Sequence, residues 1–194
     1  MDNYNWDKLS ALQIGKYAEY YAKMEFTLFG WDVYSPELDD KGIDMILRKN
    51  STFIEAQVKS VRLEKTNYVF MPKSKFAPHK GLVLCLVLFE NQQPPRLHLI
   101  PSEAWYQPDD LLADMNYGAE KKSEPEYGLR LSRKNLPILE KYRFQTIVEQ
   151  LSVVADYAQI DMASAATLLA DDYEKDSELT AFSVLDSEDF YEQR

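Results

Sequence analysis

The amino-acid sequence predicts an α/β fold in which a central mixed β-sheet is flanked by helices. Apolar residues recur at spacings of one, three and four across Leu12–Phe29, which is typical of an amphipathic helix packed on a core. After this helix, several short segments have the length and pattern of β-strands. One of them, Leu82–Phe89, is apolar at every position, as expected for a central strand buried on both faces. Helical patterns return after residue 135, so helices both precede and follow the predicted strands.

Turn-forming residues mark the ends of several elements. Gly30 follows the first helix, where a C-cap glycine belongs, and Ser35–Pro36 ends the extended segment after it. Asn50–Ser51 is predicted to turn the chain between two strands. The polar residues 107–126 are expected to form a loop. The strands predicted by the pattern are, in order, Trp31–Tyr34, Ile43–Leu47, Thr52–Val61, Tyr68–Met71, Leu82–Phe89, Arg96–Ile100 and Gly128–Leu131.

The C-terminal quarter of the chain differs from the rest in charge. Residues 1–145 contain 20 basic and 20 acidic residues, whereas residues 146–194 contain 2 basic and 12 acidic residues, which accounts for the net charge of −10. We therefore divide the chain into a globular domain over residues 1–145 and a helical acidic extension over residues 146–194. In the extension, one helix is predicted over Ile147–Tyr157 and a second from Asp161, a good N-cap residue, to about Tyr173.

Three features favour a cytoplasmic protein without membrane contact. A single cysteine, Cys85, cannot form an internal disulfide, and its place inside an apolar strand predicts a core residue. The segment Met1–Leu9 lacks the charged and apolar regions of a signal peptide. No apolar run approaches the ~18 residues that a membrane-spanning helix requires.

A locally basic segment lies within the otherwise neutral domain. Residues 41–80 contain nine basic residues against three acidic ones. Such a segment is typical either of a phosphate-facing surface or of a solvated hairpin rim, and composition alone leaves both open. If it faces nucleic acid, the expected phosphate contacts are Lys49, Arg62, Lys65, Lys73 and Lys75.

The strand Thr52–Val61 carries the most informative polar residues. Because side chains alternate along a strand, Glu55, Gln57 and Lys59 share one face. A two-residue hairpin at Asn50–Ser51 would place Asp44 directly opposite Gln57, with their Cβ atoms about 5 Å apart. These side chains would then converge within reach of one small cation.

The residue types in this group suit phosphodiester hydrolysis. Mg²⁺ prefers oxygen ligands and needs few carboxylates from the protein. A lysine beside such an ion can orient or help deprotonate an attacking water. Acyl transfer is a poor match, because the sequence contains no Gly-x-Ser-x-Gly motif. His79 and His98 are expected to be an ordinary loop residue and a strand-face residue.

Gly42–Asp44, a hairpin and then Gln57–Ser60 together resemble the motif of the PD-(D/E)XK nuclease superfamily. By this resemblance, Asp44 takes the place of the first acidic residue. Gln57 and Lys59 take the places of the (D/E)-x-K pair. Gln57 departs from the family pattern, which usually has a carboxylate there, and Glu55 on the same face could supply the missing charge.

The resemblance extends over roughly residues 10–145. Gly15–Glu19 and Gly30–Val33 are similar to the first helix and strand of the Holliday-junction-resolvase branch, in which a helix glutamate matching Glu19 contributes to the metal site. Leu97–Pro101 and Leu131–Ser132 are similar to segments of small bacterial nuclease-like domains of unassigned function in this superfamily.

The resemblance implies a restriction-endonuclease-like fold and an endonuclease that cleaves DNA with Mg²⁺ or Mn²⁺. It implies metal ligation by Asp44, Glu55, Gln57 and Glu19, and catalysis by Asp44, Glu55, Gln57 and Lys59. Because Gln57 is not a carboxylate, a second hypothesis remains open: a non-catalytic nuclease-like domain that binds nucleic acid or a protein partner.

The acidic extension has a resemblance of its own. Residues 166–173, 178–182 and 185–191 look like the C-terminal part of small bacterial antitoxins, which bind a toxin through acidic and aromatic residues. This implies a protein partner for residues 175–194, and the alternative is a solvated acidic tail. A homodimer is also left open.

Overall fold

A computed structural model describes residues 4–37, 42–117 and 123–175 of the chain. Its centre is a five-stranded sheet of order β1-β2-β3-β5-β6, and a three-stranded sheet of order β4-β8-β7 lies beside it. The strands of the large sheet are β1 (Asp32–Tyr34), β2 (Met45–Lys49), β3 (Thr52–Arg62), β5 (Leu82–Phe89) and β6 (Arg96–Pro101). Those of the small sheet are β4 (Tyr68–Pro72), β7 (Leu112–Met115) and β8 (Glu126–Arg130).

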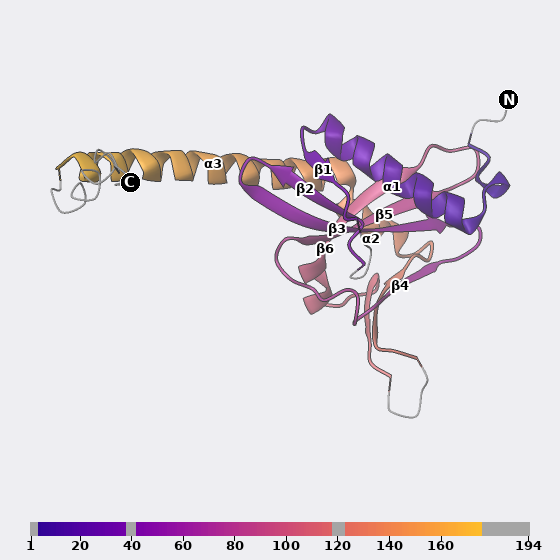
Figure 1. The fold of residues 1–194 in the computed structure, drawn as a ribbon. Helices are drawn as coiled ribbons and strands as arrows, with labels where there is room; N and C mark the ends of the chain where they lie inside the picture. The colour runs from indigo at the N-terminus through magenta and orange to yellow at the C-terminus, as the bar shows by residue number, and fades with distance from the viewer. Residues whose placement is uncertain (1–3, 38–41, 118–122, 176–194) are drawn as a thin grey trace, which may run out of the picture.

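Three α-helices accompany the sheets, namely α1 (Ala11–Leu28), α2 (Leu136–Leu139) and α3 (Phe144–Lys175). Three short 3₁₀ helices are η1 (Trp6–Lys8), η2 (Ser102–Tyr106) and η3 (Glu140–Tyr142). Figure 1 shows α1 lying across one side of the large sheet, whereas β4 lies on the other side. The predicted class, a central mixed sheet flanked by helices, is confirmed.

Helix α1 begins and ends within one residue of the predicted range Leu12–Phe29. The Ser10 side chain accepts the backbone N–H of Gln13, and the Gln13 side chain accepts that of Ser10, which forms a capping box. Gly30 follows the helix with a φ of 75°, a conformation that glycine adopts without strain. The buried face of α1 consists of Ile14, Ala18, Ala22 and Phe26.

The large sheet is mixed because β3 pairs antiparallel with β2 and parallel with β5. Every residue of β5 is buried. Its side chains alternate between two cores: Val83 and Cys85 face the core under α1, while Leu84 and Leu86 face the core shared with the small sheet. The prediction that Cys85 is a core residue is confirmed. Within the part of the chain that the structure describes, no helix is long and apolar enough to cross a membrane.

The C-terminal helix corrects the prediction of two helices. Phe144–Lys175 is one continuous helix, because this stretch contains no glycine or proline and Asp161 continues it instead of capping a new one. Its first turns belong to the core under α1, through Phe144, Ile147, Val148 and Ala155. Figure 1 shows that the rest of α3 runs outward, away from both sheets. The boundary expected after residue 145 therefore falls inside α3.

Residues 107–126, expected to be a loop, contain a strand. Leu112–Met115 form β7, which pairs antiparallel with β8. Its pattern is weak in the sequence because only two of its four residues, Leu112 and Ala113, are buried. Pairing with β8 stabilises this strand, and a single-sequence pattern does not report such a partner.

Candidate metal and catalytic site

The predicted site lies at the end of the β2–β3 ladder, next to the pair Met45–Ala56. The register of the hairpin is confirmed from Lys49 opposite Thr52 to Met45 opposite Ala56. Asn50 in the turn has a φ of 54°, which matches a tight hairpin. Beyond Ala56, β3 continues to Arg62 and pairs with β5 only, as far as the described strands go. The β2 side of residues 57–62 is thus an open strand edge.

Asp44 occupies this edge, one residue before β2 begins. Its backbone N–H donates to the carbonyl of Ala56 at 2.9 Å, and its Oδ2 accepts the backbone N–H of Val58 at 2.5 Å. A charge-assisted bond of this length holds a carboxylate firmly. Asp44 therefore lies against the Gln57–Lys59 segment, which is the neighbourhood that the sequence predicted.

The charge of Asp44 also affects the pKa values of two other side chains, Cys85 and Lys16. Burial raises the pKa of the Cys85 thiol, and the nearby Asp44 carboxylate raises it further. On α1, the hydrogen bond to Glu19 raises the pKa of Lys16, and Asp44 adds to that shift. Lys16 Nζ and Glu19 Oε2 lie 2.7 Å apart. The Lys16–Glu19 pair therefore lies close enough to Asp44 for their charges to interact.

Gln57 is buried at the same place, with 5% of its surface exposed. A Cβ atom added to Gly42 would lie 2.6 Å from Gln57 Nε2 and 3.2 Å from the Lys75 carbonyl oxygen. Gly42 and Lys75 thus cover the amide closely. Gln57 Oε1 has no hydrogen-bond partner among the described residues. A buried carbonyl oxygen without a partner is destabilising, so it is a natural ligand for a cation.

Lys59 follows two residues later on the same face of β3 and is half-buried. It makes no hydrogen bond or ion pair with any residue that the structure describes. Its ammonium group is therefore available to a phosphate or a water molecule, which is the role predicted for it.

Glu55 has a partner that the sequence did not indicate. Its Oε2 lies 3.5 Å from His79 Nε2, and the other ring nitrogen of His79 lies 2.9 Å from the carbonyl of Ala77. The two side chains line a pocket of about 310 Å³, together with Ile43, Ser74, Lys75, Ala77 and Leu82. His79 was expected to be an ordinary loop residue. His79 lies in the loop between β4 and β5, and this loop places it next to Glu55 of β3.

The predicted metal ligands fall into three places. The Asp44 carboxylate is bonded to the backbone N–H of Val58, next to Gln57, whereas Glu55 is paired with His79 and Glu19 with Lys16. Over the described ranges, no group of three or more His, Cys, Asp or Glu side chains is placed to share an ion. One carboxylate and one amide oxygen fit a Mg²⁺-type ion, which keeps several waters as ligands.

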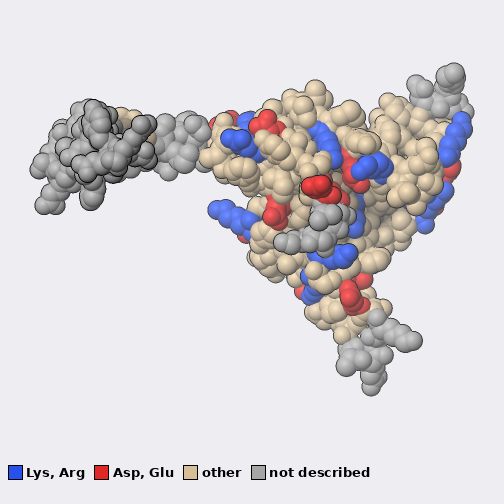
Figure 2. All heavy atoms as spheres, viewed as in Figure 1, with Lys and Arg blue, Asp and Glu red and all other residues tan. Residues whose placement is uncertain are grey.

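The predicted phosphate contacts are mostly bonded within the protein. Four of the five have intramolecular partners: Lys49 with Asp156 at 3.9 Å, Lys65 with Asp7 at 2.9 Å, Lys73 with Asp114 at 2.6 Å, and Arg62 with the carbonyls of Trp6 and Leu9. Lys75 is exposed and has no such partner in the described part of the chain. Figure 2 shows basic and acidic side chains interspersed on the face in view. A phosphate would therefore have to compete with these partners everywhere except at Lys75.

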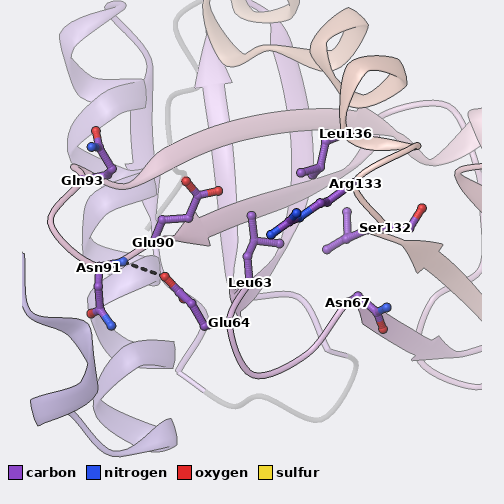
Figure 3. A pocket seen from close by; sticks show the side chains of 10 residues that line it. Leu63, Glu64, Asn67, Glu90, Asn91, Gln93, Ser132, Arg133 and Leu136 are labelled. Carbon is purple, nitrogen blue, oxygen red and sulfur yellow. Dashed lines mark hydrogen bonds between the residues drawn. The ribbon is translucent and has the colours of Figure 1, made fainter.

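A larger pocket of about 720 Å³ lies apart from this site and contains none of the predicted residues. Its walls come from the segments that follow β3, β5 and β8 (Figure 3). One wall is fixed by the backbone N–H of Asn91, which donates to Glu64 Oε1 at 3.0 Å. The pocket mixes Glu64, Glu90 and Arg133 with leucines, and it has no sequence motif that would have revealed it.

No family model and no curated protein matches this sequence. Several solved structures are similar in fold, and two of them are described here. A bacterial homing endonuclease aligns with a TM-score of 0.46 and 18% identity, over 76% of this chain and 98% of its own. A Holliday junction resolvase from Archaeoglobus fulgidus aligns with a TM-score of 0.44 and 13% identity, over 70% of this chain and 95% of its own. Likeness at this level assigns neither a family nor an activity. None of the comparisons supports the antitoxin-like segment.

Proposed function

We propose that this protein is a metal-dependent endonuclease of the PD-(D/E)XK type that hydrolyses DNA phosphodiester bonds. The observation that carries the proposal is the bond from Val58 N–H to the Asp44 carboxylate, which holds Asp44 on the Gln57–Lys59 segment. The Asp44 carboxylate is thus held at the backbone between Gln57 and Lys59, the other two residues of the motif. Gln57 Oε1 and the Lys59 ammonium group, which have no partner among the described residues, give further support.

The side chains divide the work by their chemistry. Asp44 and Gln57 supply the oxygen ligands for Mg²⁺ or Mn²⁺, and Glu55 and Glu19 are the further carboxylates proposed for the site. When bound, the divalent cation supplies Lewis acidity toward the phosphate. Lys59 holds the attacking water by a hydrogen bond and offsets the negative charge that develops on the phosphate oxygens.

A plasmid-nicking assay with Mg²⁺ or Mn²⁺ tests this proposal. Asp44→Asn removes the charge but keeps an oxygen that can accept the Val58 N–H, so the fold is preserved. We expect Asp44→Asn and Lys59→Ala each to lower the nicking rate by about 100-fold or more, because ion placement and water activation each contribute several kcal/mol.

The surface pair Asp110–Lys134, 2.9 Å apart, provides matched controls. Asp110→Asn and Lys134→Ala are expected to nick at the wild-type rate. Wild-type protein that nicks no faster than Asp44→Asn, or a Lys59→Ala variant with full activity, would contradict the assigned roles.

A second function is favoured by one observation. Gln57 stands where a carboxylate is usual, and the described residues hold no three-ligand acidic group. A nuclease-like domain of this kind would bind nucleic acid or a protein without cutting. Calorimetric titration with Mn²⁺ separates the two functions: the nuclease binds the ion and loses it in Asp44→Asn, whereas the binding protein takes up no ion in either form.

A further inference from the structure

The face of the sheet opposite α1 carries exposed aromatic side chains beside the proposed site. The strand register aligns Tyr34, Ile46 and Glu55 in one row across β1, β2 and β3. The next row contains Asp32, Arg48 and Phe53. Phe53 is 61% exposed and Tyr34 is 48% exposed. Exposed rings in the rows of a regular sheet form a flat surface that the fold itself does not use.

Arg48 adds a cation to this surface. Its guanidinium carbon lies 5.7 Å from the centre of the Phe53 ring, and its Nε donates to the carbonyl of Asn50 at 3.2 Å. It forms no ion pair with the residues that the structure describes. Arg48 therefore keeps most of its hydrogen-bond donors free beside an exposed ring.

The surface leads along β3 into the proposed site. Phe53, Glu55, Gln57 and Lys59 share one face of the strand, so Phe53 precedes Gln57 by four residues, or about 13 Å. The Glu55–His79 pocket lies between them and also contains Lys75, which has no partner among the described residues. A strand of nucleic acid that places a phosphate at Gln57 would pass this pocket and reach Phe53 within about two nucleotides.

We infer that this surface, made of Tyr34, Arg48 and Phe53, binds unpaired nucleotides of the DNA strand that enters the site. The inference rests on the proposed function and names its substrate class. Bases stack on Phe53 and Tyr34, and Arg48 contacts the adjoining phosphate, as in other single-strand binding surfaces. Bases inside a duplex already stack on their neighbours and cannot use these rings. The preferred substrate is therefore single-stranded, frayed or branched DNA.

Charge favours DNA over a protein partner at this surface. The cations Arg48 and Lys75 form no ion pair with an acidic residue in the described part of the chain. An apolar protein face would cover the two rings but leave these cations desolvated and unpaired, which is costly. A DNA strand whose bases stack on the rings would also bring phosphates that pair with these cations.

Fluorescence anisotropy with a labelled oligo(dT) strand tests the inference, in EDTA so that no cleavage occurs. Phe53→Ala is expected to weaken binding about tenfold or more, because one base loses its stacking partner. Phe53→Trp should restore it, which also rules out loss of folding as the cause. Phe70, a 53% exposed phenylalanine on β4 of the other sheet, provides the matched control, and Phe70→Ala should bind as wild type. A blunt duplex of the same length should bind equally to all variants.

The outcomes separate this inference from the proposed function. Phe53-dependent binding of oligo(dT) by a protein that never cleaves DNA would support the surface and contradict the nuclease. Cleavage by wild type with equal oligo(dT) affinity in wild type and Phe53→Ala would overturn the surface and leave the nuclease standing. No oligo(dT) binding, together with a dimer that Phe53→Ala dissociates, would assign this face to a second copy of the chain and overturn the inference.

Discussion

At the scale of single residues, Gly42 controls how tightly the site is closed. It has a φ of 74°, in a region that other residues adopt only with strain. It also leaves room for the Gln57 amide, since an added Cβ would lie 2.6 Å from Nε2. Gln57 can therefore be buried beside Asp44 only because position 42 has no side chain.

Substitution of this glycine is predicted to destabilise the protein. Gly42→Ala should lower the free energy of unfolding by about 1–3 kcal/mol, because it combines left-handed strain with a contact that must shift. Gly15→Ala is the matched control, since it lies inside α1 with open space around its Cβ, and it should stabilise by about 0.5–1 kcal/mol. Urea denaturation measures both. Equal stabilities of the two variants would show that Gly42 does not pack as described.

The protonation of the buried His98 is predicted to change the stability of the protein. It is 2% exposed on β6, and its Nδ1 has no hydrogen-bond partner among the described residues. Burial lowers its pKa from 6.5 to about 4, although the Glu140 carboxylate partly opposes this shift. The folded protein therefore holds this proton more weakly than the unfolded chain.

The sign of the resulting pH dependence follows from that difference. Between pH 6.5 and about 4, unfolding takes up a proton at His98, so the free energy of unfolding falls as the pH falls, by up to roughly 3 kcal/mol. Urea denaturation at pH 7, 6 and 5 should show a steeper loss for wild type than for His98→Gln. Parallel curves for the two proteins would contradict the lowered pKa.

At the scale of elements, the features that depend on nearby residues, such as turns and helix ends, could be predicted from the sequence. The hairpin register followed from the two-residue turn at Asn50–Ser51, and Gly30 marked the end of α1. Asp44 lies one residue before this confirmed ladder, so its predicted place directly opposite Gln57 stays a prediction. Its bond to Val58 N–H could not be foreseen, because it depends on where the β2–β3 ladder stops.

Features that depend on distant elements could not be predicted in this way. β7 exists because β8 pairs with it, and His79 meets Glu55 because the chain passes through β4 first. Phe53 was counted only as part of a strand, since alternation does not say which face another layer covers. The outward course of α3 was missed for the same reason: its pattern of apolar residues continues beyond the part that packs.

At the scale of the whole molecule, the net negative charge lies in the C-terminal quarter of the chain. Helix α3 runs outward from the sheets as far as Lys175 (Figure 1), and all of the net charge of −10 lies in residues 146–194. The proposed partner-binding segment is residues 175–194, and all of it beyond Lys175 lies outside the described residues. Its binding to a protein partner, as opposed to filling the DNA site, stays a prediction.

Deletion of residues 175–194 is accordingly predicted to leave DNA affinity unchanged. The acidic residues removed are expected to stay away from the bound strand, so they neither compete with phosphates nor repel them. Anisotropy at low salt measures this, and a partner protein that co-purifies with the full chain should be lost. A clear rise in DNA affinity after deletion would show instead that the acidic segment occupies the site.

The packing of Phe144 has a consequence for the order in which the chain folds during synthesis. Its ring contacts Phe26 of α1 and Phe29, the residue that follows this helix, with centroids 5.1 and 5.3 Å apart. Ile147, Val148 and Ala155 extend the same core. A nascent chain that has left the ribosome only as far as β8 has all its strands but lacks these residues. Its α1 core stays open to water until the first turns of α3 emerge. The last described segment to be translated thus closes the first helix onto the sheet.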